Sequence, residues 1–407
     1  MKYVHLEKVL LVEVLLLEVV VVVTKFKKTL FTLLLLLVSI RSSFAEMLEE
    51  GKTKFKLLFN VYHQNSDDGN QVFDNSGKEE ANVVEPMLFV EHQITEDTAI
   101  NAHFVFDFWT AASDTKLDGA TGASGPGRKE QSRISGNLGV RKEMGDWELS
   151  GGVGFSSEYD YRSFNGSIGI QRSMAKDNFT IGLSLQYYKD EVMLFEDLSN
   201  PPTAKISEFL PRDIFAASLT ASQIITRKDI VQAGLTYVNA NKNLESTASS
   251  VLVGGVRQAE VLPETRNRYA LSSKWVHGFD DTMAMNLSYR YYFDQWDLDA
   301  HTIRLAFLKE INDDEDFFEV ALRFHNQSSV EYYADSFDTA KEFMTSDSDL
   351  EDFSSYELST MLTSHYDTQT IYGIDFEEMV WNNGITAAKR SNGLIYAYIQ
   401  SSIGFQF

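Results

Sequence analysis

The 407-residue chain has no cysteine, which excludes disulfide bonds, thiol catalysis and cysteine-ligated metal sites. Basic residues are also scarce, because 36 Lys and Arg stand against 59 Asp and Glu, for a formal net charge of −23. Nucleic-acid binding needs a basic face that neutralises phosphates, so this charge argues against a nucleic-acid partner. No apolar run after residue 45 is long enough for a membrane helix, so any crossing there must use strands.

The N-terminal region contains an export signal that follows a short extra segment. Residues 25–45 carry the basic, apolar and small-residue parts of a secretory signal peptide in order, which predicts cleavage after Ala45. The apolar run before it, residues 9–23, contains two carboxylates and would make a poor membrane helix. We interpret residues 1–24 as a start-site artefact, with a genuine extended signal as the alternative, and residues 46–407 as one mature domain.

Hydrophobicity in the mature domain alternates with a period of two residues. In residues 282–293, for example, Leu287 and Tyr289 alternate with Ser288 and Arg290. This alternation predicts strands with one apolar face, and most have the ten or so residues of a tilted membrane-crossing strand. The segments, about sixteen with fourteen as the nearest alternative, are 54–64, 81–93, 98–110, 131–142, 146–157, 161–174, 177–190, 213–225, 229–240, 266–277, 282–293, 298–310, 314–326, 354–364, 370–379 and 393–407.

The connections between these segments alternate in length. Short turns alternate with longer loops, while two of the expected long positions are tight, at 158–160 and 294–297. Outer-membrane barrels have short periplasmic turns and longer outside loops. The sequence therefore predicts an all-β fold, a transmembrane antiparallel up-and-down β-barrel with both termini in the periplasm. The longer loops are expected at 65–80, 111–130, 191–212, 241–265, 327–353 and 380–392.

The last segment ends the chain on an aromatic residue. Phe407, Phe405 and Ile403 share one face, and polar residues occupy the other. A terminal aromatic on such a strand resembles the recognition signal of bacterial outer-membrane β-barrels. We therefore expect Phe405 and Phe407 to form an assembly signal for the barrel-assembly machinery, and the apolar face to contact outer-membrane lipid. The closing strand of a soluble sandwich could alternate in the same way.

Four short blocks are notable for their order and spacing: residues 121–124, 156–163, 260–268 and 289–296, the last continuing to Ala300-His301-Thr302. Together they resemble the DUF3570 family of bacterial outer-membrane proteins. The resemblance implies a β-barrel in the Gram-negative outer membrane with no assigned activity. It also implies a redox or metal context, through the genes that often neighbour those of the family.

If the apolar face contacts lipid, the opposite face lines a lumen and carries charge. Charged side chains in a pore set its ion selectivity, and a barrel of this size is usually wide enough for water. We predict a channel, with a lumen plugged by salt bridges as the alternative; any constriction would come from loop 111–130 or loop 327–353. The lumen-lining candidates are Asp107, Glu148, Arg290, Arg304, Glu319, Arg323, His103 and His325.

Charged residues also gather where strands reach the outer mouth. Such a group could bind a cation or a polar solute, but we favour a structural salt-bridge network that lets the connections be short. Loop 335–352 is acidic and lacks the spacing of an EF-hand, so we expect a solvated loop there and not a Ca²⁺ site. The mouth candidates are Glu158, Asp160, Arg162, Arg266, Arg268, Asp294, Asp297, Asp299 and His301.

No diagnostic Ser–His spacing or phosphate-binding loop is present, so we predict no catalytic residues, no metal and no cofactor. The predicted function is a porin-like channel or passive transporter for small polar solutes or ions. One alternative is a non-conducting scaffold or binding barrel that partners a periplasmic redox or export system. The third is an outer-membrane hydrolase. The sequence leaves the oligomeric state open.

Overall fold

The computed structural model describes residues 47–66, 80–111, 131–197, 205–246, 250–312, 316–371 and 374–407. The start-site and signal-peptide interpretations, and most of the predicted loop 111–130, lie outside these ranges. Within the described part of the chain, no helix is long and apolar enough to cross a membrane.

Most of the described chain is β-strand. Sixteen long strands form one wall, and β8, β9, β12, β13 and β19 are short additional strands. The bounds are β1 (Thr53–Ser66), β2 (Glu80–Thr95), β3 (Thr98–Ala111), β4 (Gln131–Met144), β5 (Trp147–Ser157), β6 (Tyr161–Met174), β7 (Phe179–Val192), β8 (Phe195–Asp197), β9 (Lys205–Ile206), β10 (Leu210–Ile224), β11 (Asp229–Asn241), β12 (Ser250–Val253), β13 (Val256–Ala259), β14 (Thr265–Gly278), β15 (Met283–Asp294), β16 (Asp299–Glu310), β17 (Phe317–Gln327), β18 (Phe353–Tyr366), β19 (Gln369–Ile371), β20 (Ile374–Arg390) and β21 (Leu394–Gln406).

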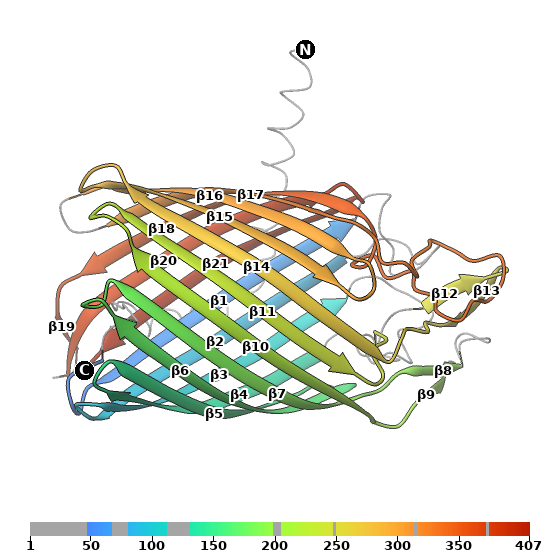
Figure 1. Cartoon of the computed structure of the whole chain (residues 1–407), viewed down its shortest axis with the longest axis horizontal. Helices are drawn as coiled ribbons and strands as arrows, with labels where there is room; N and C mark the ends of the chain where they lie inside the picture. Colours follow the sequence, from blue (N-terminus) through green and yellow to red (C-terminus); the bar gives the residue numbers. More distant parts are fainter. Residues whose placement is uncertain are drawn as a thin grey trace, which may run out of the picture.

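The long strands close into a barrel (Figure 1). Each pairs antiparallel with the next long strand along the chain, and β1 pairs with both β2 and the last strand, β21. The closing seam ends in two backbone hydrogen bonds between Thr53 and Phe407, of 2.9 and 3.0 Å. The predicted up-and-down β-barrel is therefore confirmed, with sixteen rather than fourteen strands among the described residues.

One face of the long strands is apolar and points outward. On β15, Leu287 and Tyr289 are 37% and 39% exposed, whereas Ser288 and Arg290 line the lumen side. Directly opposite residues of antiparallel strands project from the same face, so the pairing registers extend this division around the whole ring. An outward apolar face around a polar interior defines the wall as a transmembrane β-barrel.

The two ends of the barrel differ. The short turns and the C-terminus lie at one end, and the hairpins β8/β9 and β12/β13 extend beyond the other (Figure 1). The turn between β4 and β5 shows why short connections suffice, because Gly145 takes a φ of 62°, which a residue without a Cβ adopts at no steric cost. Thr53 and Phe407 meet at the short-turn end, so both ends of the described chain lie there as predicted.

The predicted long loop at 380–392 was wrong. Residues 374–390 form β20, and only a tight connection at 391–393 separates it from β21. Within β20, the run Asn382-Asn383-Gly384 has residue types that are common in turns, but it pairs in register with both β18 and β21. Sheet pairing on both sides satisfies the backbone of this run and outweighs its weak strand propensity. The predicted strand at 370–379 covers only β19 and the start of β20.

Candidate functional site: the barrel lumen

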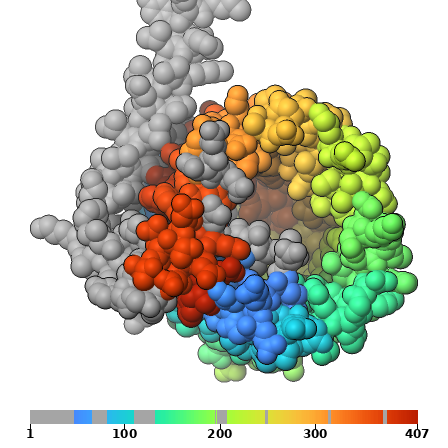
Figure 2. All heavy atoms as spheres, turned by 90° about the vertical axis from the view of Figure 1, so that its left-hand side faces the viewer, coloured from blue at the N-terminus to red at the C-terminus, as the bar shows by residue number. Residues whose placement is uncertain are grey.

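The eight lumen candidates all lie on the strand face opposite the apolar band. The registers pair Asp107 with Arg133, Arg304 with Arg323, and Arg323 with Glu357, each between adjacent strands. Alternation explains this placement, since each candidate stands one residue from an outward apolar side chain. Viewed from the short-turn end, the barrel wall surrounds a hollow (Figure 2).

Strands β2 to β5 carry one set of lumen charges, in which carboxylates outnumber arginines. Arg133 forms an ion pair with Asp107, and its guanidinium lies 3.9 Å from Glu85. Closer to the short-turn end of the barrel, Arg141 lies 3.0 Å from Glu91 and 3.4 Å from Glu148. Each arginine is thus shared among two or three carboxylates, which leaves this wall acidic.

Strands β16 to β18 hold a second set of lumen charges. Arg304 lies 2.5 Å from Glu319, and Arg323 lies 3.7 Å from Glu357. His325 shares a hydrogen bond of 2.8 Å with the Thr302 hydroxyl. His103, on the other side of the barrel, stacks on Phe89 with 4.1 Å between the ring centroids.

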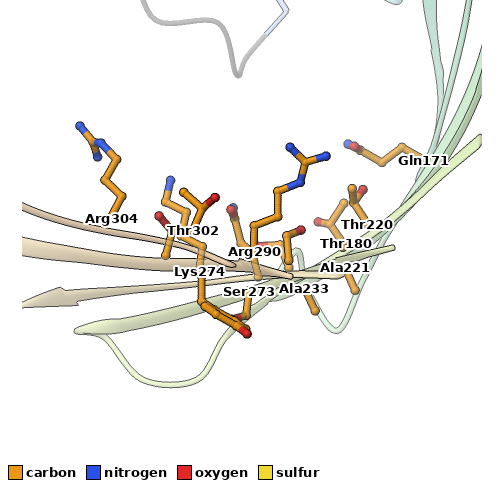
Figure 3. Close-up of a pocket in the computed structure, with 16 residues that line it drawn as sticks. Gln171, Thr180, Thr220, Ala221, Ala233, Ser273, Lys274, Arg290, Thr302 and Arg304 are labelled. Atoms are coloured by element: carbon orange, nitrogen blue, oxygen red, sulfur yellow. The ribbon is translucent and has the colours of Figure 1, made fainter. Parts of the chain in front are cut away.

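A cavity of about 520 Å³ opens on the lumen side of the wall formed by β6, β7, β10, β11, β14, β15 and β16 (Figure 3). Arg290 and Arg304 rise from their strands into this space, and Gln171 reaches in from β6. Lys274 also lines the cavity, near the hydroxyl groups of Ser272 and Ser288. No carboxylate lines this cavity among the described residues, although the chain as a whole is strongly acidic.

At the outer mouth, a compact network surrounds Trp296. Arg266 donates to Asp294 Oδ2 through Nε at 2.8 Å and Nη2 at 2.5 Å, and its guanidinium lies over the Trp296 ring, 4.2 Å from the ring centroid. The Tyr292 hydroxyl also donates to Oδ2 of Asp294, at 2.6 Å. The other carboxylate oxygen, Oδ1, accepts the Trp296 backbone N–H at 2.8 Å. The network fixes the tight turn between β15 and β16.

The nine mouth candidates do not form one cluster. Arg266, Arg268 and Asp294 stand together, whereas Glu158 and Asp160 lie at the β5–β6 turn, where Glu158 is 3.9 Å from Arg133. The other four are placed separately. Arg162 lies over the Phe209 ring at 4.0 Å, Asp297 takes a φ of 63° in its turn, and the Asp299 and His301 side chains, 3.8 Å apart, face outward beside Tyr291.

The acidic loop after β17 is folded onto the rim. Tyr333 donates hydrogen bonds to Asp335 at 2.9 Å and Glu351 at 2.7 Å, and burial together with these carboxylates raises its pKa. Arg390 of β20 lies 2.6 Å from Asp349. In the described ranges, no three His, Asp or Glu side chains converge in a way that could hold a metal ion.

A buried carboxyl group lies under this loop. Glu260 is 5% exposed and accepts the Ser246 backbone N–H at 3.3 Å. Burial, followed by the nearby Asp347 carboxylate, raises the pKa of Glu260 to about 8. The side chain is therefore mostly protonated at neutral pH, which lets it be buried without a cation.

Several lumen charges were not among the sequence candidates. Lys274 stands between the outward residues Ser273 and Trp275 of β14, so alternation alone could have found it. Alternation along the strand could also have found the other lumen charges that the sequence analysis missed. These are Glu85, Glu91, Arg133, Arg141 and Glu357.

Fold and lumen together define a transmembrane β-barrel protein with a polar, charged interior. The chain belongs to the family described as "Protein of unknown function (DUF3570)", which matches residues 123–378. The family suspected from the sequence is thus confirmed. A comparison with curated protein sequences finds no significant match.

Solved structures with a similar arrangement share little sequence. A bacterial polysaccharide outer membrane secretin is 9% identical, with 86% of this chain and 98% of that chain covered and a TM-score of 0.44. The outer membrane protein OpdK from Pseudomonas aeruginosa is 10% identical, with 87% and 98% covered and a TM-score of 0.38. A Pseudomonas aeruginosa FadL homologue is also 10% identical, with 88% and 90% covered and a TM-score of 0.39. Similarity at this level carries no argument about the function of this chain.

Proposed function

We propose that this protein forms a porin-like channel, or passive transporter, for small polar solutes or ions in the bacterial outer membrane. One observation carries the proposal: the lumen ion pairs of the described residues run along the wall. Each joins strands that are adjacent or two apart in the ring, such as Arg141 with Glu91, and none crosses the lumen. A plug of salt bridges would need pairs that span the interior.

The proposal includes the route to the membrane. The chain is exported with cleavage after Ala45, and its C-terminal strand engages the barrel-assembly machinery. Phe405 and Phe407 support this role, because both stack on Phe55 at the outward side of the closing seam, with centroids 5.2 and 5.4 Å apart. No catalytic residues are assigned, since the Asp299 and His301 pair faces outward, away from the lumen.

The test uses the absence of cysteine. Ser288→Cys places a thiol in the lumen, and Leu287→Cys, the matched control, places one on the lipid face of the same strand. The protein and both variants are purified from outer membranes of an expressing host and inserted into planar bilayers. We expect stable conductance steps from all three, which a bulky charged thiol reagent reduces in Ser288→Cys alone.

Two results would contradict the proposal. Correctly folded protein that never conducts would favour the non-conducting scaffold or binding barrel. Conductance that the thiol reagent leaves unchanged in Ser288→Cys, despite complete labelling, would mean that current does not pass this wall.

A further inference from the structure

Two cations of the lumen cavity have no acidic partner in the part of the chain that the structure describes. Lys274 on β14 and Arg290 on β15 make no ion pair with any described residue, whereas Arg304 on β16 is 2.5 Å from Glu319. Most other lumen arginines are neutralised by one or two carboxylates, such as Arg141. An unpaired cation on a low-dielectric wall attracts a counter-ion from solution.

The three cations surround one point on the wall. Ser288 of β15 is directly opposite Lys274 on one side and Arg304 on the other, and Arg290 stands two residues further along the same face. With strands about 4.8 Å apart, the Cα atoms of Lys274 and Arg304 are roughly 10 Å from each other. Long side chains from these positions can converge on one small ligand.

The surroundings fit an oxyanion. Hydroxyl groups of Ser272, Ser288 and Thr302 line the same cavity and can donate to its oxygens. Gly234 leaves room beside Ser272 in the cavity wall, because a Cβ at this position would come within 2.6 Å of the Ser272 Oγ. Guanidinium groups match carboxylate and phosphate geometry with two parallel hydrogen bonds.

We infer that this part of the wall is a binding subsite for a small multivalent oxyanion that carries phosphate or carboxylate groups. Lys274 and Arg290 are its anchors, and Arg304 is a third, partly neutralised contact. Its role in transport rests on the proposed channel function, whereas binding itself does not.

The test measures inorganic phosphate in two ways on protein purified from membranes: block of the chloride current in bilayers, and equilibrium dialysis of the solubilised barrel. We expect Lys274→Gln and Arg290→Gln each to weaken block and binding about tenfold, which is the effect of losing one charge-assisted hydrogen bond. Lys56→Gln, which removes a lumen cation of β1 on another wall, is the matched control and should change neither. Competition by succinate distinguishes carboxylate from phosphate preference.

The outcomes separate the two proposals. Conductance with no phosphate block and no binding would overturn the subsite and leave the channel. Binding that depends on Lys274 and Arg290 in a barrel that never conducts would support the subsite and overturn the channel. Equal weakening by Lys56→Gln would mean that only net charge matters, and would overturn the subsite.

Discussion

Glu260 shows how a single residue can make a loop sensitive to pH. It is buried where β13 leads towards β14, close to Asp347 of the acidic loop, and its raised pKa keeps it mostly neutral at pH 7. The folded state therefore holds this proton more tightly than the unfolded chain does. The linked stability is fully present below the unfolded pKa, near 4.5, and is lost as pH rises towards and through about 8.

We predict that the protection of residues 250–262 from hydrogen exchange falls between about pH 5 and about pH 8 and then levels off, because Glu260 must ionise in place or leave its site. Glu260→Gln keeps the shape and the acceptor without the titration, so its protection, corrected for intrinsic exchange, should stay level. Parallel pH profiles for the two proteins would show that Glu260 does not control this loop.

At the scale of elements, the tight β15–β16 turn organises two long loops. Trp296 is 2% exposed and packs with Leu262 of the loop before β14 and Val330 of the loop after β17. Isolated bridges add a second attachment, Val253 with Phe337 and Val261 with Met344. The mouth charges Arg266 and Asp294 hold the indole in place, which agrees with the structural interpretation of that group.

Trp296→Ala should therefore loosen both loops together. Replacing a buried Trp costs about 3 kcal/mol or more, and here the loss falls on loop packing and not on the strand ladder. We expect residues 328–352 and 250–262 to lose exchange protection and become open to proteolysis, while the strands stay protected. Trp275→Ala, at an outward position near the short-turn end, is the control that should leave the loops intact. Unchanged loop protection in Trp296→Ala would contradict this prediction.

At the scale of the whole molecule, closure of the ring sets the lumen charge pattern. β3 and β15 are eight strands apart in a ring of sixteen, so the acidic wall with Asp107 faces the wall with Arg290 across the interior. Such an arrangement places a field across the lumen, which in the proposed channel would orient a dipolar or anionic solute. In a ring of fourteen strands, two strands that are eight positions apart would no longer stand directly opposite each other.

Closure can be tested by a cross-link, because the chain offers no competing thiols. Leu58 and Ser402 are directly opposite on β1 and β21, both are buried, and the register makes them a closely spaced pair. Leu58→Cys/Ser402→Cys should oxidise to a disulfide that shifts gel mobility until reduced. The pair Leu58→Cys/Ile403→Cys, whose side chains lie on opposite faces, should not cross-link. Equal cross-linking in both would contradict the register.

The sequence by itself determined the strands and their faces. Alternation is a local property, so Leu287 and Tyr289 could be assigned outward and Arg290 inward without knowledge of any partner. The one large error is the loop at 380–392, where Asn382-Asn383-Gly384 pairs with both β18 and β21, and no local pattern reveals that pairing.

Only the tertiary structure decided which lumen charges are neutralised. Arg141 meets Glu91 fifty positions away through pairing across β3, while Lys274 and Arg290 face hydroxyl groups and find no described carboxylate. The tertiary structure also separates the mouth candidates. The His301 side chain lies on the outward face beside Tyr291, whereas Asp294 accepts a hydrogen bond from the backbone N–H of Trp296 in the turn. These outcomes depend on register and ring closure, which are set by contacts between distant segments and leave no local pattern in the sequence.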